Sequence, residues 1–218
     1  MRKAYASPGG GALEVLRGVS FALGAGETLA VMGASGAGKS TLLHLLGGLD
    51  MADGGQARLG EIELTRAGGA ELARVRNEQI GFVFQFHHLL PDLTALENVA
   101  LPLLVARRKP RAARAAAGAM LEAVGLGARA SHRPGELSGG EQQRAAIARA
   151  LVHEPRLVLC DEPTGNLDAR AGAEVAALLS TLARTRGAAV IVATHNEQLA
   201  AACDRTLFLK DGLLVKQP

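Results

Sequence analysis

The stretch Gly33-Ala-Ser-Gly-Ala-Gly-Lys-Ser-Thr41 fits the phosphate-loop pattern G-x-x-x-x-G-K-[ST]. Glycines allow the backbone of such a loop to turn tightly and to aim successive N–H groups at one anionic centre. Lys39 adds a positive charge for the β- and γ-phosphates of a nucleotide, and the Ser40 hydroxyl can bind Mg²⁺. The sequence therefore predicts a nucleotide site made by nine residues: Gly33, Ala34, Ser35, Gly36, Ala37, Gly38, Lys39, Ser40 and Thr41.

The sequence on either side of this loop agrees with that interpretation. Residues 27–32 are typical of a buried strand, and residues 40–46 are typical of a helix that ends at Gly47-Gly48. The N-terminus of that helix would then point at the bound phosphate. The alternative is a glycine-rich turn without a ligand, and the strand–loop–helix context favours the nucleotide.

The composition narrows the class of protein. The chain has 218 residues, of which 48% are hydrophobic, so it can bury a sizeable core. Its formal net charge of +3 does not indicate nucleic-acid binding. Two cysteines are too few for a disulfide framework, and Cys160 is predicted to be a small core residue. The basic run at 107–109, 111 and 114 predicts a solvated helix face, with a membrane-proximal or partner-facing patch as the alternative.

Neither a signal peptide nor an apolar run of roughly 18 residues is evident in the sequence. We therefore expect a cytoplasmic protein whose membrane contact is made only through a partner.

Strands and helices are expected to alternate around an inserted helical region. Continuous apolar strands at 157–160 and 188–193 indicate a parallel sheet covered on both faces. Further strands are predicted at 13–16, 19–23, 56–59, 80–84, 206–209 and 213–216, and helices at 70–77, 169–186 and 197–202. Between the strands at 80–84 and 157–160 the pattern becomes helical. We predict one cassette over 1–218 with a helical lobe at approximately 86–153.

Two adjacent carboxylates follow the strand at 157–160. The carboxyl end of a parallel strand is where such sheets bind ligands. Asp161 would hold Mg²⁺, and Glu162 could polarise the attacking water. The alternative is an acidic turn before Pro163, which the phosphate loop on a separate strand makes less favourable.

Leu137-Ser-Gly-Gly-Glu-Gln-Gln143 precedes a strongly helical stretch. Ser138 and Glu141 have the spacing of a capping box, which alone would explain them. Gly139 and Gly140 weaken a helix start, but they are expected where a ligand approaches the backbone closely. We therefore expect a second anion site at this helix N-terminus. One nucleotide fills only the first site, so we infer that the second serves a nucleotide held by another subunit.

The order of these motifs resembles the ATP-binding cassette (ABC) family over essentially the whole chain. The resemblance rests on the phosphate loop, Gln85, the 137–141 segment (Leu137, Ser138, Gly139, Gly140 and Glu141), the run Leu157-Val-Leu-Cys-Asp-Glu-Pro163, Asn166-Leu-Asp168 and His195. It implies an α/β P-loop NTPase core with an antiparallel β subdomain and an inserted α-helical subdomain. It also implies that the chain hydrolyses ATP with Mg²⁺.

The same resemblance assigns roles to single residues. Two identical cassettes stack head to tail, with ATP between one phosphate loop and the 137–141 segment of the other. Gln85 senses the γ-phosphate and Mg²⁺, Asp168 links the two sites across the dimer, and His195 contacts the γ-phosphate. Gln85 and His195 thus join Glu162 as catalytic candidates, and Ser40, Gln85 and Asp161 are the candidates for holding Mg²⁺.

Within the ABC family, four stretches closely resemble the LolD family, the ATPase subunits of lipoprotein-releasing (Lol) systems. These stretches are 40–50, 81–104, 132–134 and 161–168. The resemblance implies a cassette at the cytoplasmic face of the inner membrane that works with permease subunits. Related ATPases of macrolide efflux and cell division are the alternative. A soluble cassette protein acting on nucleic acid or ribosomes is the alternative from another class.

Tyr5 is the candidate for stacking on the adenine base, because stacking needs an aromatic ring and little else. Family members usually have a strand before this aromatic. Only residues 1–4 precede Tyr5, so we expect that strand to be short or missing. The alternative is an incidental tyrosine near the terminus.

The run Phe86-His-His-Leu-Leu90 follows Gln85 directly. Adjacent histidines such as His87 and His88 rarely converge on one metal ion, and burial of the whole run is a second alternative. An aromatic and two leucines instead offer apolar anchors beside polar contacts, as in a docking patch. By resemblance, a short permease helix inserts at Phe86, His87, His88, Leu89 and Leu90, with Phe86 and Leu89 as its anchors.

Overall fold

A six-stranded sheet organises the computed structural model, which describes residues 1–6 and 10–215. In spatial order its strands are β10 (Leu213–Val215), β9 (Arg205–Lys210), β3 (Thr28–Met32), β8 (Ala189–Thr194), β7 (Leu157–Asp161) and β6 (Ile80–Phe84). β10 runs antiparallel to β9, and the other neighbouring pairs are parallel. The predicted parallel sheet is therefore confirmed. Of the predicted strand at 213–216, residue 216 lies outside the described residues.

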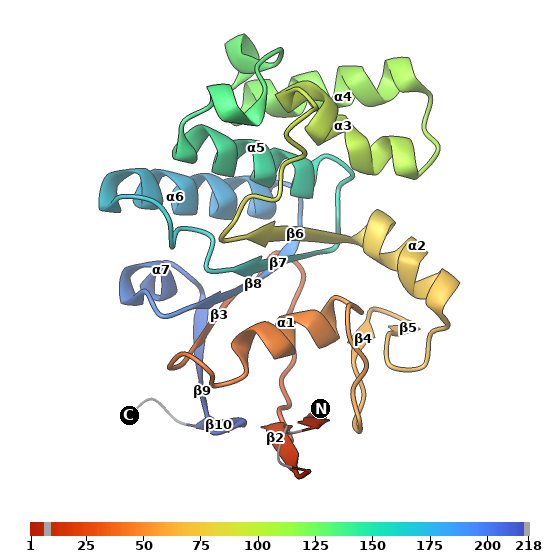
Figure 1. The fold of residues 1–218 in the computed structure, drawn as a ribbon, viewed down its shortest axis with the longest axis vertical. Helices are drawn as coiled ribbons and strands as arrows, with labels where there is room; N and C mark the ends of the chain where they lie inside the picture. The colour runs from red at the N-terminus through yellow and green to blue at the C-terminus, as the bar shows by residue number, and fades with distance from the viewer. Residues whose placement is uncertain (7–9, 216–218) are drawn as a thin grey trace.

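Helices cover both faces of this sheet (Figure 1). α1 (Lys39–Leu46) lies on one face, and α5 (Gly139–Leu151) and α6 (Ala169–Thr185) lie on the other. The side chains of β7 alternate accordingly. Leu157 and Leu159 belong to the apolar cluster around α1, whereas Val158 and Cys160 belong to the cluster around α5 and α6. Cys160 is fully buried, as predicted, and its burial raises the pKa of the thiol.

Two small antiparallel hairpins lie beside the main sheet. β1 (Arg2–Ala6) pairs with β2 (Ala12–Arg17), and β4 (Arg58–Leu59) pairs with β5 (Ile62–Glu63). The first strand is present, so the expectation that it is missing was wrong, although only Arg2–Ala4 of it precede Tyr5. Tyr5 lies within β1, opposite Leu13, because pairing with β2 supplies a partner for the whole of residues 2–6.

The predicted strand at 19–23 was also wrong, because residues 18–24 form no strand. Val19 is buried, and Phe21 and Leu23 pack against the cluster around α1. These apolar side chains are thus buried without forming a strand. The predicted helices at 70–77, 169–186 and 197–202 are confirmed as α2 (Gly69–Gln79), α6 and α7 (Glu197–Ala201).

The segment between β6 and β7 is helical. It contains α3 (Ala95–Val105), α4 (Pro110–Ala123) and α5, and two short 3-10 helices at Gly127–Arg129 and Pro134–Glu136 lie between α4 and α5. Val99 of α3, Met120 of α4 and Ile147 of α5 form one cluster with Val83 and Val158 of the sheet. These helices therefore share an apolar core with the sheet, and the division into an inserted lobe stays a prediction. Within the described residues, none of the helices is long and apolar enough to cross a membrane.

The close approach of β6 to α5 gives a stability prediction. A Cβ atom on Gly81 would lie 2.2 Å from the carbonyl oxygen of Ala150, a backbone atom that cannot easily move. We expect Gly81→Ala to lower the free energy of unfolding by about 1–3 kcal/mol, as overpacked core positions do. Urea denaturation of the purified chain measures this change.

Gly118 in α4 is the matched control, because its added Cβ would meet only a Leu96 methyl group at 3.9 Å. Gly118→Ala should raise stability by roughly 0.5–1 kcal/mol, since alanine is the better helix residue. Equal stability of Gly81→Ala and the parent chain would show that the β6–α5 contact is looser than described.

Candidate functional site

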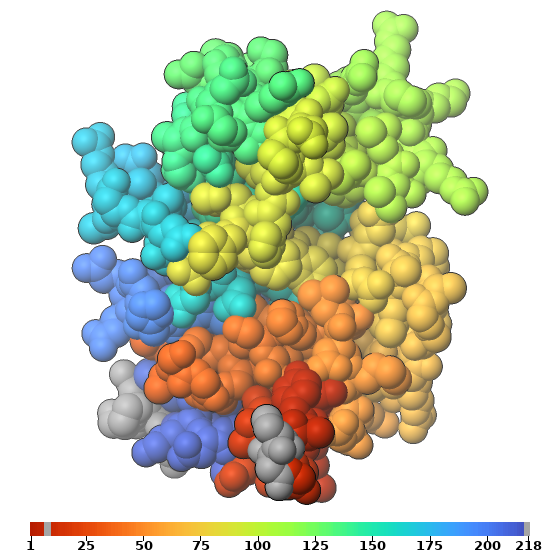
Figure 2. All heavy atoms as spheres, viewed as in Figure 1, coloured from red at the N-terminus to blue at the C-terminus, as the bar shows by residue number. Residues whose placement is uncertain are grey.

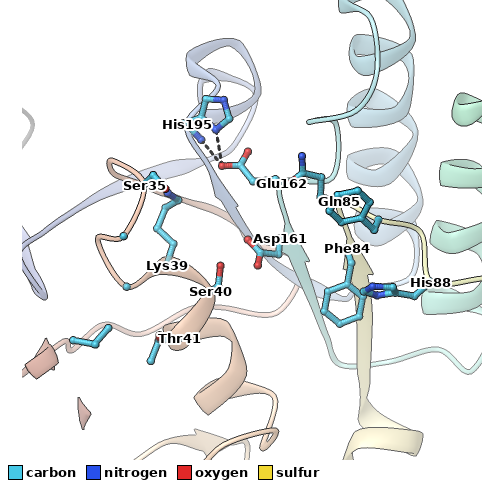
Figure 3. A pocket seen from close by; sticks show the side chains of 14 residues that line it. Ser35, Lys39, Ser40, Thr41, Phe84, Gln85, His88, Asp161, Glu162 and His195 are labelled. Carbon is cyan, nitrogen blue, oxygen red and sulfur yellow. Dashed lines mark hydrogen bonds and ion pairs between the residues drawn. The ribbon is translucent and has the colours of Figure 1, made fainter. Parts of the chain in front are cut away.

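The carboxyl ends of four neighbouring strands bring the predicted residues together. β3 ends at Met32 and leads into the phosphate loop, while β8, β7 and β6 lead into His195, Glu162 and Gln85. Parallel strands present these ends at one edge of the sheet, where such sheets bind ligands. The edge borders a cleft of about 840 Å³, lined by the phosphate loop, Gln85, Asp161, Glu162 and His195 (Figure 3).

The backbone of the phosphate loop requires glycine at three of its positions. Gly36 and Gly38 have φ values of 80° and 101°, a left-handed region that residues with a Cβ rarely adopt. A Cβ on Gly33 would lie 2.3 Å from the carbonyl oxygen of Leu209. The predicted loop geometry is thus present in the chain itself.

Lys39 extends along the inside of this loop. Its Nζ donates to the carbonyl oxygens of Gly33 at 2.8 Å and Ala34 at 3.2 Å, and the residue is only 9% exposed. Six of the nine predicted loop residues line the cleft: Ser35, Gly36, Gly38, Lys39, Ser40 and Thr41. Gly33, Ala34 and Ala37 instead line a neighbouring hollow against β9 and β10. Val15 of β2 also lines the cleft, and nothing in its sequence context identified it.

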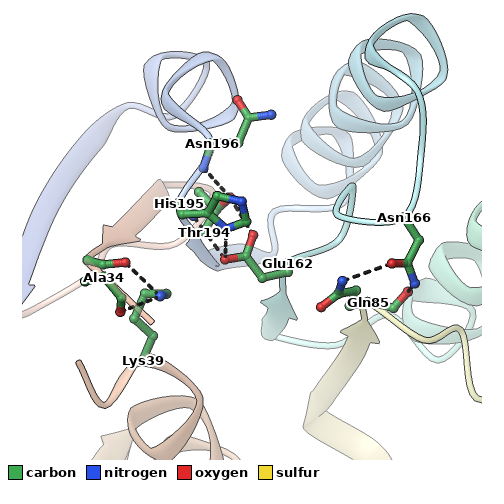
Figure 4. A network of polar contacts seen from close by, with 9 residues as sticks. Ala34, Lys39, Gln85, Glu162, Asn166, Thr194, His195 and Asn196 are labelled. Atoms are coloured by element: carbon green, nitrogen blue, oxygen red, sulfur yellow. Dashed lines mark hydrogen bonds and ion pairs between the residues drawn. The ribbon is translucent and has the colours of Figure 1, made fainter. Parts of the chain in front are cut away.

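Glu162 and His195 form one hydrogen-bonded unit with Thr194 (Figure 4). The Thr194 hydroxyl donates to Glu162 Oε2 at 2.9 Å, and the backbone N–H of His195 donates to Oε1 at 3.0 Å. The Nδ1 atom of His195 lies 2.7 Å from the same Oε1. Glu162 itself has a φ of 46°, so its backbone is held in a strained conformation at the strand end. The carboxylate is thereby fixed at the edge of the cleft.

Gln85 is held by Asn166 in a reciprocal contact. Gln85 Nε2 donates to Asn166 Oδ1 at 2.9 Å, and Asn166 Nδ2 donates to the Gln85 carbonyl oxygen at 3.1 Å. Asn166 therefore fixes the amide nitrogen of the Gln85 side chain and leaves its Oε1 atom for other partners. The sequence placed Asn166 in a motif but did not predict this contact.

Three oxygen donors suited to Mg²⁺ lie around the cleft. They are the Ser40 hydroxyl, the Gln85 side-chain amide oxygen and the Asp161 carboxylate. Mg²⁺ prefers oxygen ligands, and it usually takes one or two from the protein and the others from water and nucleotide phosphates. This donor set fits a magnesium–nucleotide site.

The 137–141 segment lies outside the lining of this cleft in the described chain. Ser138 caps α5: Glu141 N–H donates to its Oγ at 3.3 Å, and Ser138 N–H donates to Glu141 Oε2 at 2.8 Å. The capping box is thus confirmed, and the backbone hydrogen bond from Ser138 lowers the pKa of Glu141. Asp168 caps α6 in the same way, since its Oδ1 accepts from Ala171 N–H at 2.9 Å.

The packing of this chain does not require the two glycines of that segment. A Cβ on Gly139 would lie 3.7 Å from a Leu167 methyl group, and one on Gly140 would lie 3.8 Å from the Ala171 Cβ. These are ordinary van der Waals distances, and neither glycine has a positive φ. Packing within the described part of this chain therefore does not explain why both positions are glycine.

Tyr5 stands at the rim of the nucleotide region and outside the lining of the cleft. Its hydroxyl donates to Asp50 Oδ2 at 2.7 Å, and Lys3 Nζ lies 4.8 Å from its ring centroid. Burial and the Asp50 contact raise the pKa of Tyr5, and the Thr41 hydroxyl opposes that shift. The ring is thus fixed near the phosphate loop, and its stacking on a base stays a prediction.

The 86–90 segment lies on the surface beside the cleft (Figure 2, in yellow). Phe86 is 67% exposed and Leu90 is 45% exposed. Phe86 and His88 also line the cleft. Leu89, predicted to be an anchor, is partly buried and packs against the apolar cluster that includes residues of α3 and α5. The exposed leucine of the segment is Leu90.

Comparisons with known proteins agree with this site. A family model described as ABC transporter matches residues 16–165. One similar solved structure is described as a dimeric, post-hydrolysis state of the ATP-binding cassette MJ0796 bound to ADP and Pi. It has a TM-score of 0.90 and 38% identity over 100% of this chain and 95% of that one. Another, described as the dimeric structure of MJ0796, a bacterial ABC transporter cassette, has a TM-score of 0.89 and 39% identity over 99% and 94%.

The fold and the site define a P-loop nucleotide-binding ATPase with an α/β core. Since the family model covers more than half of the chain, the chain belongs to the ABC transporter family, as an ATP-binding cassette. It binds ATP with Mg²⁺ and hydrolyses the nucleotide.

Proposed function

We propose that two copies of this chain form the working ATPase, each supplying half of every site. The phosphate loop of one copy would hold ATP, and the 137–141 segment of the other would complete the site. Two features support this arrangement: the segment lies outside the chain's own cleft, and its glycines are not required by the chain's own packing. The similar MJ0796 cassette is described as dimeric.

Within each site we propose separate roles for the clustered side chains. Glu162 would accept a proton from the attacking water, with Thr194 and His195 fixing its carboxylate. His195 would also contact the γ-phosphate. Ser40, Asp161 and Gln85 would hold Mg²⁺, which neutralises phosphate charge when bound. Asp168 caps α6 and directly follows Leu167, whose methyl group is the neighbour that a Cβ on Gly139 would meet, and it would link the two sites across the dimer.

We further propose that the chain is the ATPase of a complex that releases lipoproteins from the inner membrane for a periplasmic carrier. It would lie at the cytoplasmic face and contact the membrane through transmembrane permease subunits. The observation that carries this proposal is the 86–90 segment, which resembles the LolD family. Phe86 and Leu90 are exposed there, and Phe86 lines the nucleotide cleft. Macrolide-efflux and cell-division ATPases are the alternatives within transport.

This proposal gives a docking prediction. Replacing Phe86 and Leu90 together with Ser should abolish assembly with the permease and lipoprotein release in reconstituted vesicles. Exposed apolar side chains at the centre of an interface commonly carry most of its binding energy. The isolated chain should still bind and hydrolyse ATP, because neither side chain is assigned to phosphate, Mg²⁺ or the attacking water. Phe86 lines the cleft, so the loss of assembly should far exceed any change in ATP binding or basal hydrolysis.

The matched control replaces Met51 and Leu213, which are 71% and 44% exposed on other parts of the surface, with Ser. This pair should leave assembly intact. Normal lipoprotein release by the Phe86 and Leu90 double variant would refute the docking role. If an efflux or cell-division permease co-purified with the parent chain, the proposed role in lipoprotein release would be wrong and the corresponding alternative would take its place.

A further inference from the structure

The 86–90 segment is tied by its backbone to α5. Arg149, in the last turns of that helix, donates from Nη1 to the His88 carbonyl oxygen at 2.6 Å and from Nη2 to the His87 carbonyl oxygen at 2.8 Å. A guanidinium presents its N–H groups in a fixed fork, so two such bonds define both position and orientation. The partners are about 60 residues apart in sequence, so this is a tertiary contact. We call these two hydrogen bonds from Arg149 the clamp.

Two other side chains, one from α3 and one from α5, bind the backbone on either side of this contact. We call α3, α4 and α5 together the helical layer. Asn98 of α3, which is fully buried, accepts from Leu90 N–H at 2.8 Å and donates to the Leu90 carbonyl oxygen at 3.1 Å. Gln143 of α5 donates to the Phe84 carbonyl oxygen at 3.3 Å. The backbone of the 86–90 segment is therefore hydrogen-bonded to side chains of α3 and α5, although the segment follows a strand of the central sheet.

Two residues of the 86–90 segment also line the nucleotide cleft. Phe86 and His88 line the cleft together with Gln85, and the His88 ring packs against Phe84 at 5.0 Å between centroids. His88 has a φ of 48°, so its backbone is held in a left-handed conformation where Arg149 binds its carbonyl. Arg149 is half-buried, and this burial lowers the pKa of its guanidinium.

We propose that Arg149 is a positioning residue that makes the 86–90 segment move with α5. A change at the cleft on nucleotide binding and a displacement of the exposed Phe86 surface would then be one motion. Without the clamp, the segment would follow the strand or relax independently, and the nucleotide would no longer control the surface. This inference rests on ATP binding and on the described contacts, and it does not depend on the cargo or on the permease.

The chain offers a direct reporter of this motion, because it contains no tryptophan. Phe86→Trp places a single fluorophore on the segment, and its emission can be followed while a non-hydrolysable ATP analogue with Mg²⁺ is added. Binding affinity is measured separately with a fluorescently labelled nucleotide. Arg149→Lys, introduced in the Phe86→Trp chain, keeps the positive charge but loses the two-armed contact.

Arg149→Lys should reduce the nucleotide-dependent change in emission by more than about half, while nucleotide affinity stays within about twofold. Local opening of the segment, followed by hydrogen exchange of peptides covering 86–94, should become about tenfold more frequent, the scale of losing one charge-assisted hydrogen bond. Arg111→Lys is the matched control, since Arg111 is exposed on α4 of the same helical layer. It should change neither readout.

Three results would overturn the proposal: an unchanged emission response in Arg149→Lys, no response in the Phe86→Trp parent, or an equal loss in Arg111→Lys. If Arg149→Lys does not fold, hydrogen exchange of the unmodified chain tests the proposal instead. Peptides from 86–90 and from the second half of α5 should then change protection together when the analogue binds. Independent changes in the two peptides would contradict the clamp.

Discussion

Replacing Glu162 with Gln is expected to slow ATP hydrolysis by about two or more orders of magnitude, the scale of lost general-base catalysis. Gln has nearly the same size and keeps one oxygen that can accept from the backbone N–H of His195. Its amide cannot take a proton from water. ATP binding should remain, because the phosphate loop is untouched, and the ATP-bound dimer should accumulate. Steady-state phosphate release and size-exclusion chromatography with ATP measure these two effects.

Two comparisons make this result specific. Lys39→Ala should instead weaken nucleotide binding itself, since Lys39 lies within the phosphate loop. Glu174→Gln, an exposed carboxylate on α6, should leave hydrolysis unchanged. Phosphate release by Glu162→Gln at close to the parent rate would remove Glu162 from the proposed role.

Much of the candidate site could be predicted because it depends on local sequence and on one general property of sheets. The phosphate loop carries its own geometry in Gly36 and Gly38, which fit left-handed positions. The apolar runs before Glu162 and His195 indicate parallel strands, whose carboxyl ends meet at one edge. The grouping of these residues beside the phosphate loop then follows without any knowledge of distant contacts.

The remainder of the site depends on contacts between residues far apart in sequence. Thr194 reaches Glu162 across 32 residues, Asn166 reaches Gln85 across 81, and Arg149 reaches His88 across 61. Each is a polar side chain that can also stay in solvent, so its type and spacing do not identify its partner. Only the packing of the helical layer against the sheet brings these pairs together.

Parts of the fold could not be predicted for the same reason, because they too depend on contacts between distant residues. The sequence did not predict a strand at residues 2–6 with certainty, because its pairing with β2, and not its own sequence, stabilises it. Residues 19–23 were predicted to form a strand, but their apolar side chains are buried without a strand partner. Leu89 and Leu90 are chemically identical neighbours, and only the position of the helices behind them decides which is exposed.

Gly139→Asp is expected to reduce ATP hydrolysis by about two orders of magnitude, comparable to the loss of one preorganised contact to a developing charge. The substitution places a carboxylate where the neighbour's phosphate would approach. The chain itself should tolerate it, because a Cβ there meets only a Leu167 methyl group at 3.7 Å and an acidic residue suits the first turn of a helix. Nucleotide binding to the monomer should therefore be nearly unchanged, as measured by titration with labelled ATP.

Mixing two inactive variants tests whether the site is shared. Chains carrying Gly139→Asp keep an intact phosphate loop, and chains carrying Lys39→Ala keep an intact 137–141 segment. If each site is built from both chains, a mixed dimer contains one complete site, and hydrolysis should partly return when the two proteins are combined. Gly139→Asn is the matched control for size, and it should be less damaging than Gly139→Asp because it adds no charge. A site built within one chain predicts no recovery on mixing, and it also predicts that Gly139→Asp weakens monomeric ATP binding as severely as Lys39→Ala does.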